Sequence, residues 1–320
     1  MKKINALLDM LKDRLFSSTY QLQRVVILTA IALVLVVISF GSYYYYDRYY
    51  RPQPKIAVAS LSQAEQAVRD NPDDPDKRLE LAGTYMTNGR FDEAISQAFI
   101  VKQVYPDNIG ADFVLGISYA NTGKPTDAIE PLTKFVESRK DEDMPGLDKQ
   151  LQAAAYYLGD SYLQLGKPQE AVSPLEMAVM WSRTDADAMY KLGLAYSGAH
   201  EYEKAADMFH AATTFVPDFL EAYQGLEASY TALNRPELAL YARGMMAYST
   251  KDYEAARDLL LESAKAEPNF APTFAGLGRT YESLNDLPNA KVSYETALKI
   301  DVNNYTASNG LQRVEAMMKK

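Results

Sequence analysis

The sequence predicts an all-α protein in which short antiparallel helix pairs repeat along the chain and stack into an α-solenoid, preceded by one membrane-spanning helix. Two observations carry this prediction. Alanine, tyrosine and leucine recur at fixed positions of a 34-residue period over residues 61–320, and such self-similarity is typical of solenoid proteins. An uninterrupted apolar run also lies near the N-terminus, where it has the character of a membrane anchor.

The composition excludes several classes of site. The chain has 320 residues, no cysteine and two histidines, His200 and His210. Disulfide scaffolds, zinc ribbons, iron–sulfur clusters and cysteine nucleophiles all require cysteine. The sequence contains no phosphate-binding loop and no HExxH or GxSxG motif. We therefore expect no catalytic residue, no metal site and no cofactor. An enzyme that uses scattered Asp and Glu residues is the weaker alternative.

Charge is distributed unevenly along the chain. Residues 1–60 carry a net charge of +5, and residues 61–320 carry a net charge of −14. Nucleic-acid binding usually requires a basic surface, and the larger part of this chain has the opposite sign. Nucleic acid is therefore not expected as a partner.

Residues 1–24 are predicted to form a basic amphipathic segment on the cytoplasmic side of a membrane. Apolar residues recur there at helical spacing, at Ile4, Leu7, Leu8, Leu11 and Leu15. A helix with this pattern can lie along a membrane surface, although a short helix without such a role fits the pattern equally well.

Residues 25–46 are predicted to form a transmembrane helix. Residues 25–40 read VVILTAIALVLVVISF without a charge, and the tyrosines Tyr43–Tyr46 follow closely. As a helix this segment would rise about 33 Å, which is enough to cross a bilayer, and the tyrosines would lie where an aromatic belt is expected. A cleaved signal peptide is the alternative, but the segment before the apolar run is long for one, and bulky tyrosines follow the weak cleavage site.

The charges that flank this segment predict its orientation. Five basic residues precede it and three follow it closely, a modest bias that places the N-terminus in the cytoplasm. The predicted location is therefore the inner, cytoplasmic membrane of a bacterium, with the repeats in the extracytoplasmic (periplasmic) space; the reversed topology is the alternative. Residues 47–60 contain two prolines and are predicted to be a linker.

Residues 61–320 contain six to seven copies of one pattern. An alanine near the start of the second helix follows a tyrosine by nine residues and a leucine by thirteen in all copies but one; the Ala256 copy has Ala247 in place of the tyrosine. The alanines are Ala94, Ala128, Ala171, Ala205, Ala239, Ala256 and Ala290, and the tyrosines are Tyr85, Tyr119, Tyr162, Tyr196, Tyr230 and Tyr281. Small residues let the two helices approach closely, and each hairpin buries its remaining face on the next.

This pattern resembles the tetratricopeptide repeat (TPR) family, whose motif runs W-x2-L-G-x2-Y, A-x3-F and P. The segments LGISYANTGKPTDAIEPL, LGLAYSGAHEYEKAADMF and LGRTYESLNDLPNAKVSY carry it in this chain. The resemblance covers residues 61–320 and implies a right-handed superhelix of helix hairpins that binds a protein or peptide partner.

Two steps in the array depart from the 34-residue period. One step is 43 residues long, which indicates an insertion of nine residues near 139–146, expected to form a polar loop or longer helix ends. Another step is only 17 residues long. Residues 236–248 should therefore serve as the second helix of one repeat and the first helix of the next.

The ends of the array and its turns also give expectations. Residues 61–72 match only a second helix and residues 305–318 only a first helix, which predicts an N-terminal half-repeat and a C-terminal capping helix. Gly89, Gly123 and Gly166 are predicted to end first helices. His200 replaces glycine at the same position of a later repeat.

The resemblance also implies where a partner would bind. In TPR proteins the concave surface is formed mainly by the first helices, and its central positions in this chain are aromatic and aliphatic, types that anchor peptides and helices. The predicted partner-binding residues are Phe113, Ile117, Tyr156, Tyr190, Leu194, Tyr241 and Met245. Alternatively, some of these side chains only pack between neighbouring first helices. The family's carboxylate-clamp residues are absent from the matching positions.

The sequence thus predicts a membrane-anchored TPR scaffold or adaptor that binds a protein partner or peptide segment in the extracytoplasmic space. Two alternatives stay open. In the first alternative, the chain is a constitutive structural subunit of a membrane complex. In the second, it is a chaperone-like factor in envelope protein or cytochrome c assembly. The last alternative rests on analogy with bacterial proteins of similar layout.

Overall fold

The structure, a computed structural model, describes residues 27–28, 36, 56–141 and 143–319. The chain divides into two units, Met1–Gln63 and Ala64–Lys320. The predicted amphipathic segment, most of the predicted transmembrane segment and most of the predicted linker lie outside the described residues. Among the residues that are described, no helix has both the length and the apolar character needed to cross a membrane.

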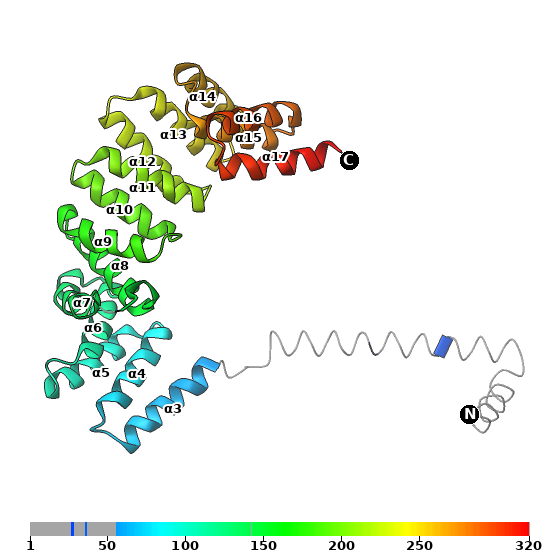
Figure 1. Cartoon of the computed structure of the whole chain (residues 1–320). Coiled ribbons are helices and arrows are strands. Elements are labelled where there is room, and N and C mark those ends of the chain that lie inside the picture. Colours follow the sequence, from blue (N-terminus) through cyan, green and yellow to red (C-terminus); the bar gives the residue numbers. More distant parts are fainter. Residues whose placement is uncertain (1–26, 29–35, 37–55, 142, 320) are drawn as a thin grey trace, which may run out of the picture. The chain divides into compact units, whose positions relative to one another are not determined.

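The described part of the chain consists of α-helices joined by short connections, without a strand. Figure 1 shows the helices of the second unit stacked in sequence order along a curved path. This is the predicted all-α solenoid. The helices are α3 (Ile56–Asp70), α4 (Pro75–Thr87), α5 (Phe91–Val104), α6 (Ile109–Asn121), α7 (Pro125–Arg139), α8 (Lys149–Gln164), α9 (Pro168–Trp181), α10 (Ala186–Gly198), α11 (Tyr202–Phe215), α12 (Leu220–Ala232), α13 (Pro236–Ser249), α14 (Tyr253–Ala266), α15 (Ala271–Ser283), α16 (Leu287–Ile300) and α17 (Tyr305–Met318).

Most connections along the array are of two kinds. Within a hairpin, a three-residue turn joins the two helices, and its middle residue has a positive φ, the conformation that glycine adopts most easily. These residues are Gly89, Gly123, Gly166, His200, Asn234, Lys251 and Asn285, with φ between 55° and 72°. Between hairpins, four-residue loops such as 105–108 and 216–219 connect the helices. The glycine turns and the role of His200 agree with the sequence prediction.

Glycines in the first helices let each second helix approach closely. A Cβ atom added to Gly116 would lie 2.5 Å from Cγ of Leu132, and one added to Gly193 would lie 2.7 Å from Cδ1 of Phe209. Leu132 and Phe209 are fully buried. A large side chain of the second helix thus fills the space that a side chain on the glycine would need, which fixes the spacing of the two helices.

The nine inserted residues lengthen both helices and the loop between them. α7 has 15 residues and α8 has 16, whereas the neighbouring hairpins α4–α5 and α10–α11 each have helices of 13 and 14 residues. The connection spans residues 140–148 instead of four residues and contains a 3-10 helix, Pro145–Leu147. Met144 and Leu147 project from this loop into solvent.

α13 belongs to two hairpins. Three-residue turns, 233–235 and 250–252, flank it on both sides, whereas the other internal helices have a turn on one side and a longer loop on the other. α13 packs along α12 and α14 and also contacts α15. Contact between successive first helices is the general pattern of this array, as between α6 and α8. This is the arrangement expected from the 17-residue step.

The two ends of the array are closed differently. α3 begins at Ile56, inside the stretch expected to be a linker, and Tyr85 of α4 donates a hydrogen bond to Glu65 of α3 at 3.1 Å. At the other end, α17 packs against α16 and α15. Val314 of α17 is fully buried in that contact, so the last helix covers the apolar face of the final hairpin.

Candidate functional site

The first helices α6, α8 and α10 contact one another in order along the array. Residues at the same repeat position on these helices therefore follow one another in a row. Phe113, Tyr156 and Tyr190 form this row, here called the aromatic row, and all three are half-buried. Leu194, one turn after Tyr190, is half-buried as well. These four predicted residues keep exposed surface that a partner can contact.

Each ring of the aromatic row is supported by a second ring. The ring centroids are 4.9 Å apart for Phe113 and Phe135, 5.3 Å apart for Tyr156 and Tyr157, and 5.0 Å apart for Tyr190 and Phe219. Rings that are already restrained lose less conformational freedom when a partner binds. The row is thus pre-organised for contact.

The other three predicted residues are buried. Ile117 is 6% exposed, Tyr241 4% and Met245 2%. Tyr241 is enclosed by Tyr223 and Phe270, whose ring centroids lie 6.4 Å and 5.2 Å away. The structure therefore places these three side chains in the packing between helices, which is the alternative that the sequence left open for some of the seven residues.

A cleft of about 490 Å³ opens beside Tyr156, between α8, the end of α9 and the start of α10. Its lining includes Lys149, Gln152, Tyr156, Tyr157, Asp185 and Asp187. Burial raises the pKa of Tyr156, and the carboxylates of Asp160, Asp187 and Asp185 raise it further. The cleft thus combines two aromatic rings with a negative potential. It can accommodate an apolar or a cationic side chain.

A salt bridge joins the first helices on this side of the array. Lys191 of α10 lies 2.5 Å from a carboxylate oxygen of Asp160 on α8. Both side chains are mostly buried, so the pair is less screened by solvent than a surface pair. Tyr156 lies one helical turn before Asp160, and Tyr190 lies directly before Lys191. The salt bridge therefore fixes the spacing between the two tyrosines.

Further along the array, α15 reaches back to the loop between α11 and α12. Arg279 Nη2 lies 2.8 Å from Asp218 Oδ1, and Nη1 donates a hydrogen bond to the carbonyl of Pro217 at 3.1 Å. A cavity of about 190 Å³ lies there, lined in part by Tyr241, Met245 and the start of α17. Near α15, the surface formed by the first helices is therefore already covered by side chains of the array itself.

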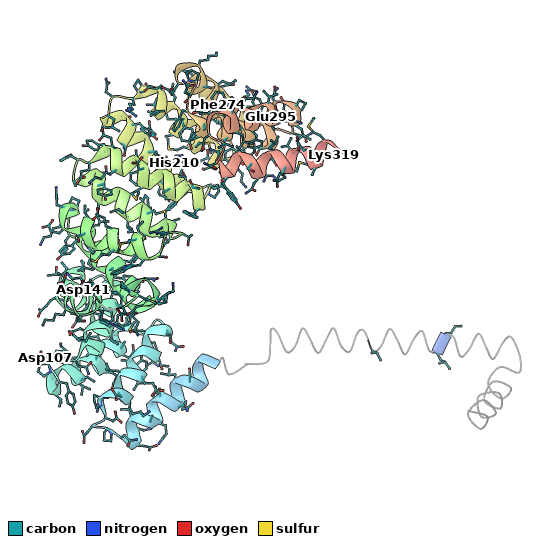
Figure 2. The ribbon with its side chains drawn as sticks, in the orientation of Figure 1. Asp107, Asp141, His210, Phe274, Glu295 and Lys319 are labelled. Carbon is teal, nitrogen blue, oxygen red and sulfur yellow. The ribbon has the colours of Figure 1, made fainter. Side chains whose placement is uncertain are left out.

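His210 of α11, labelled in Figure 2, also lines this cavity. Burial lowers the pKa of the His210 imidazole below its ordinary value, although Asp207 acts in the opposite direction. Among the described residues, no group of three or more acidic or histidine side chains is arranged to hold a metal ion.

Comparison with known families adds to this geometry. Three family models, each described as a tetratricopeptide repeat, match residues 59–100 with 113–188, residues 187–218, and residues 271–304. The chain contains tetratricopeptide repeats. The motif-based prediction of TPR repeats is thereby confirmed.

The TPR array is similar to parts of longer proteins. It is 27% identical over 189 residues to the peroxisomal targeting signal receptor of Pichia angusta, which is 57% of this chain and 32% of the receptor. It is 29% identical over 130 residues to the heat shock protein STI1 of Saccharomyces cerevisiae, which is 40% of this chain and 19% of that protein. The chain thus spans about a third or less of the length of these relatives.

A solved structure supports the fold. The crystal structure of YrrB, described as a TPR protein with an unusual peptide-binding site, matches 61% of this chain and 96% of its own with a TM-score of 0.53. Sequence identity is 17%. At that level the likeness shows a shared TPR architecture.

Sequence reasoning missed the polar contacts between repeats. In the TPR register, Arg279 occupies a position of the first helix that faces other helices. A lone basic residue at such a position was the available sign of a polar contact between repeats. Its partner Asp218 lies in a loop, and Asp160 with Lys191 pairs two different repeats. The repeat period does not define either pairing.

Proposed function

We propose that this TPR protein is a membrane-anchored scaffold that binds a segment of a partner protein along the aromatic row. The observation that carries the proposal is the row itself, in which three half-buried aromatic residues follow one another on three successive first helices beside an open cleft. Binding energy at protein interfaces concentrates in aromatic anchors of this kind. A relative named as a targeting signal receptor supports a role in recognising polypeptide segments.

Replacing Phe113, Tyr156 and Tyr190 together by alanine is expected to weaken partner binding at least tenfold. Truncation of one anchor often costs about 2 kcal/mol, and about 1.4 kcal/mol corresponds to a factor of ten. Crosslinking in native membranes followed by mass spectrometry identifies the partner. Its affinity for the wild-type chain and the variant is then compared by titration.

A matched control replaces three exposed aromatic residues away from the row, Phe99, Tyr105 and Phe215, and should leave the affinity within about twofold of wild type, because exposed rim contacts contribute little. Circular dichroism checks that the helices of both variants persist. A folded row variant that binds like wild type would show that the partner uses another surface. Loss of helix in the row variant would assign these rings to packing between repeats.

The proposed anchor is residues 25–46, with the N-terminus in the cytoplasm and the TPR array in the extracytoplasmic space of a bacterial envelope. The support is the uncharged apolar run and the excess of basic residues before it. Protease added to cells with a permeabilised outer layer should digest the array and spare a tag at Met1. The same treatment after detergent lysis should remove both. If the array resists protease until the cells are lysed, the topology is the reverse of the proposed one, with the array in the cytoplasm.

A further inference from the structure

A pocket of about 510 Å³ lies outside the aromatic row, where α11, the turn between α12 and α13, and the loop between α14 and α15 meet. In a regular array of antiparallel helices, the three-residue turns gather at one end of the helices and the four-residue loops at the other. Because turns flank α13 on both sides, the loop 267–270 comes to the end where the turn 233–235 lies. Both connections line the pocket. The half-repeat therefore creates it.

The pocket has an apolar floor and an acidic wall. Leu238 and Tyr230 are buried in the floor. The wall carries four carboxylates against one cation; these are Glu203, Asp207, Glu237, Glu267 and Arg235. Within the described part of the chain, none of these five side chains forms an ion pair. The wall therefore has a net negative charge that the protein itself does not neutralise.

Tyr230 adds an independent sign of a missing ligand. Its side chain is 7% exposed, and its hydroxyl makes no hydrogen bond to another described residue. Burial raises the pKa of Tyr230 to about 12, with Asp207 raising it further and Arg235 lowering it, so the hydroxyl lies within electrostatic reach of these two groups of the wall. The hydroxyl lines the pocket and has no partner among the described residues, so it is free to accept a hydrogen bond from a donor placed there.

We propose that this pocket binds the lysine side chain of a basic polypeptide segment. The aliphatic stem of lysine packs on the apolar floor while its ammonium group donates hydrogen bonds to Asp207, Glu237 and the Tyr230 hydroxyl. The net charge of −14 over residues 61–320 attracts such a segment from a distance. The volume is within the range of known ligand pockets. The site shares no residue with the aromatic row and does not depend on it.

A defined probe tests the proposal on the full chain in nanodiscs of neutral phospholipid. The chain is labelled with ¹³C at tyrosine Cε, and the Tyr230 signal is assigned with Tyr230→Phe. Acetyl-Leu-Lys-Leu-amide should shift this signal with half-saturation at a concentration at least tenfold lower than the uncharged acetyl-Leu-norleucine-Leu-amide. Equal binding of the two peptides, or no shift with either one, would overturn the proposal.

A charge-matched pair of variants separates the site from the general negative charge of the array. Asp207→Asn with Glu237→Gln should weaken binding of the lysine peptide at least tenfold. Glu254→Gln with Glu262→Gln removes the same charge from exposed positions on α14 and should leave binding within twofold of wild type. Equal losses in both pairs would overturn the proposal. If the Asp207→Asn and Glu237→Gln double variant has a lowered helix content, the single variant Asp207→Asn replaces it in this comparison.

The aromatic-row variant separates this inference from the proposed function. Alanine at Phe113, Tyr156 and Tyr190 should leave binding of the lysine peptide unchanged, because those residues lie on α6, α8 and α10 and the pocket does not include them. Loss of lysine-peptide binding in that variant would contradict the independence of the two sites. Failure of the row to bind a partner would leave the lysine pocket standing.

Discussion

Replacing Asp112 by alanine is expected to destabilise the N-terminal repeats by about 3–5 kcal/mol, the usual cost of breaking a buried ion pair. The carboxylate of Asp112 is 3% exposed and lies 2.8 Å from the ammonium group of Lys102, which is 17% exposed. Without the carboxylate, the ammonium group stays buried with the carbonyl of Pro106 as its remaining partner. The uncompensated charge is the reason for the large effect.

The same pair contributes little compared with an apolar pair of similar size. Taking two charges out of water is costly, and their attraction roughly offsets that cost. Lys102→Met with Asp112→Leu should therefore be much more stable than Asp112→Ala alone. The pair spans α5 and α6, which belong to different hairpins, so the loss is expected at the interface between two repeats.

Denaturant unfolding combined with amide hydrogen exchange measures this effect, because a repeat array can open locally before it unfolds globally. Protection should fall first in α5 and α6. Glu130→Ala, which breaks an exposed pair with Lys134, is the control and should cost under about 1 kcal/mol. A free energy of unfolding for Asp112→Ala within 1 kcal/mol of wild type would show that water reaches Lys102.

The hairpins could be predicted from sequence because the interactions that define them lie within one repeat. Gly116 and Leu132 meet across a single turn. The residue with positive φ lies eight residues after the leucine in every hairpin except α13–α14, where Arg243 takes the place of the leucine. The half-repeat at α13 was visible as a short step for the same reason. Local spacing is enough to place helices and turns of this kind.

Exposure and ion pairing could not be predicted in this way. Tyr156 and Tyr241 occupy the same repeat position, yet Tyr156 is half-buried and Tyr241 is enclosed by Tyr223 and Phe270. The difference arises because α13 meets neighbours on both sides as a member of two hairpins. Register gives the direction in which a side chain points, but the surrounding helices decide whether that surface is free.

Removal of α17, by ending the chain at residue 304, is expected to destabilise the last hairpin by about 3–6 kcal/mol. Val314 of α17 and Tyr294 of α16 are both fully buried, with Gly310 lying directly on the tyrosine ring. Full burial of one such side chain contributes about 1.5–3 kcal/mol, and both are lost or exposed in the truncated chain. Exposed apolar surface at the end of a repeat array also favours aggregation.

Polar contacts add to the attachment of α17. Arg313 binds Glu282 of α15 through two hydrogen bonds of 2.5 Å and 2.7 Å, and Tyr294 donates a third at 2.9 Å. Burial alone would raise the pKa of Glu282, but these bonds hold it below the ordinary value of 4.5. Since the folded state lowers this pKa, the contribution is present above pH 4.5 and is lost as the pH falls further.

A second truncation provides the control, because it removes chain from the same end without removing the contact. Ending at residue 316 deletes the exposed Met317 and Met318 but keeps Val314 and Arg313, so it should unfold like the full chain. Amide exchange in α15 and α16 and light scattering on warming report the outcome. With residue 304 as the last, exchange in these two helices should accelerate and scattering should begin at lower temperature. Unchanged protection of α16 in that chain would mean that Tyr294 is held by its own hairpin, and that α17 does not stabilise the array.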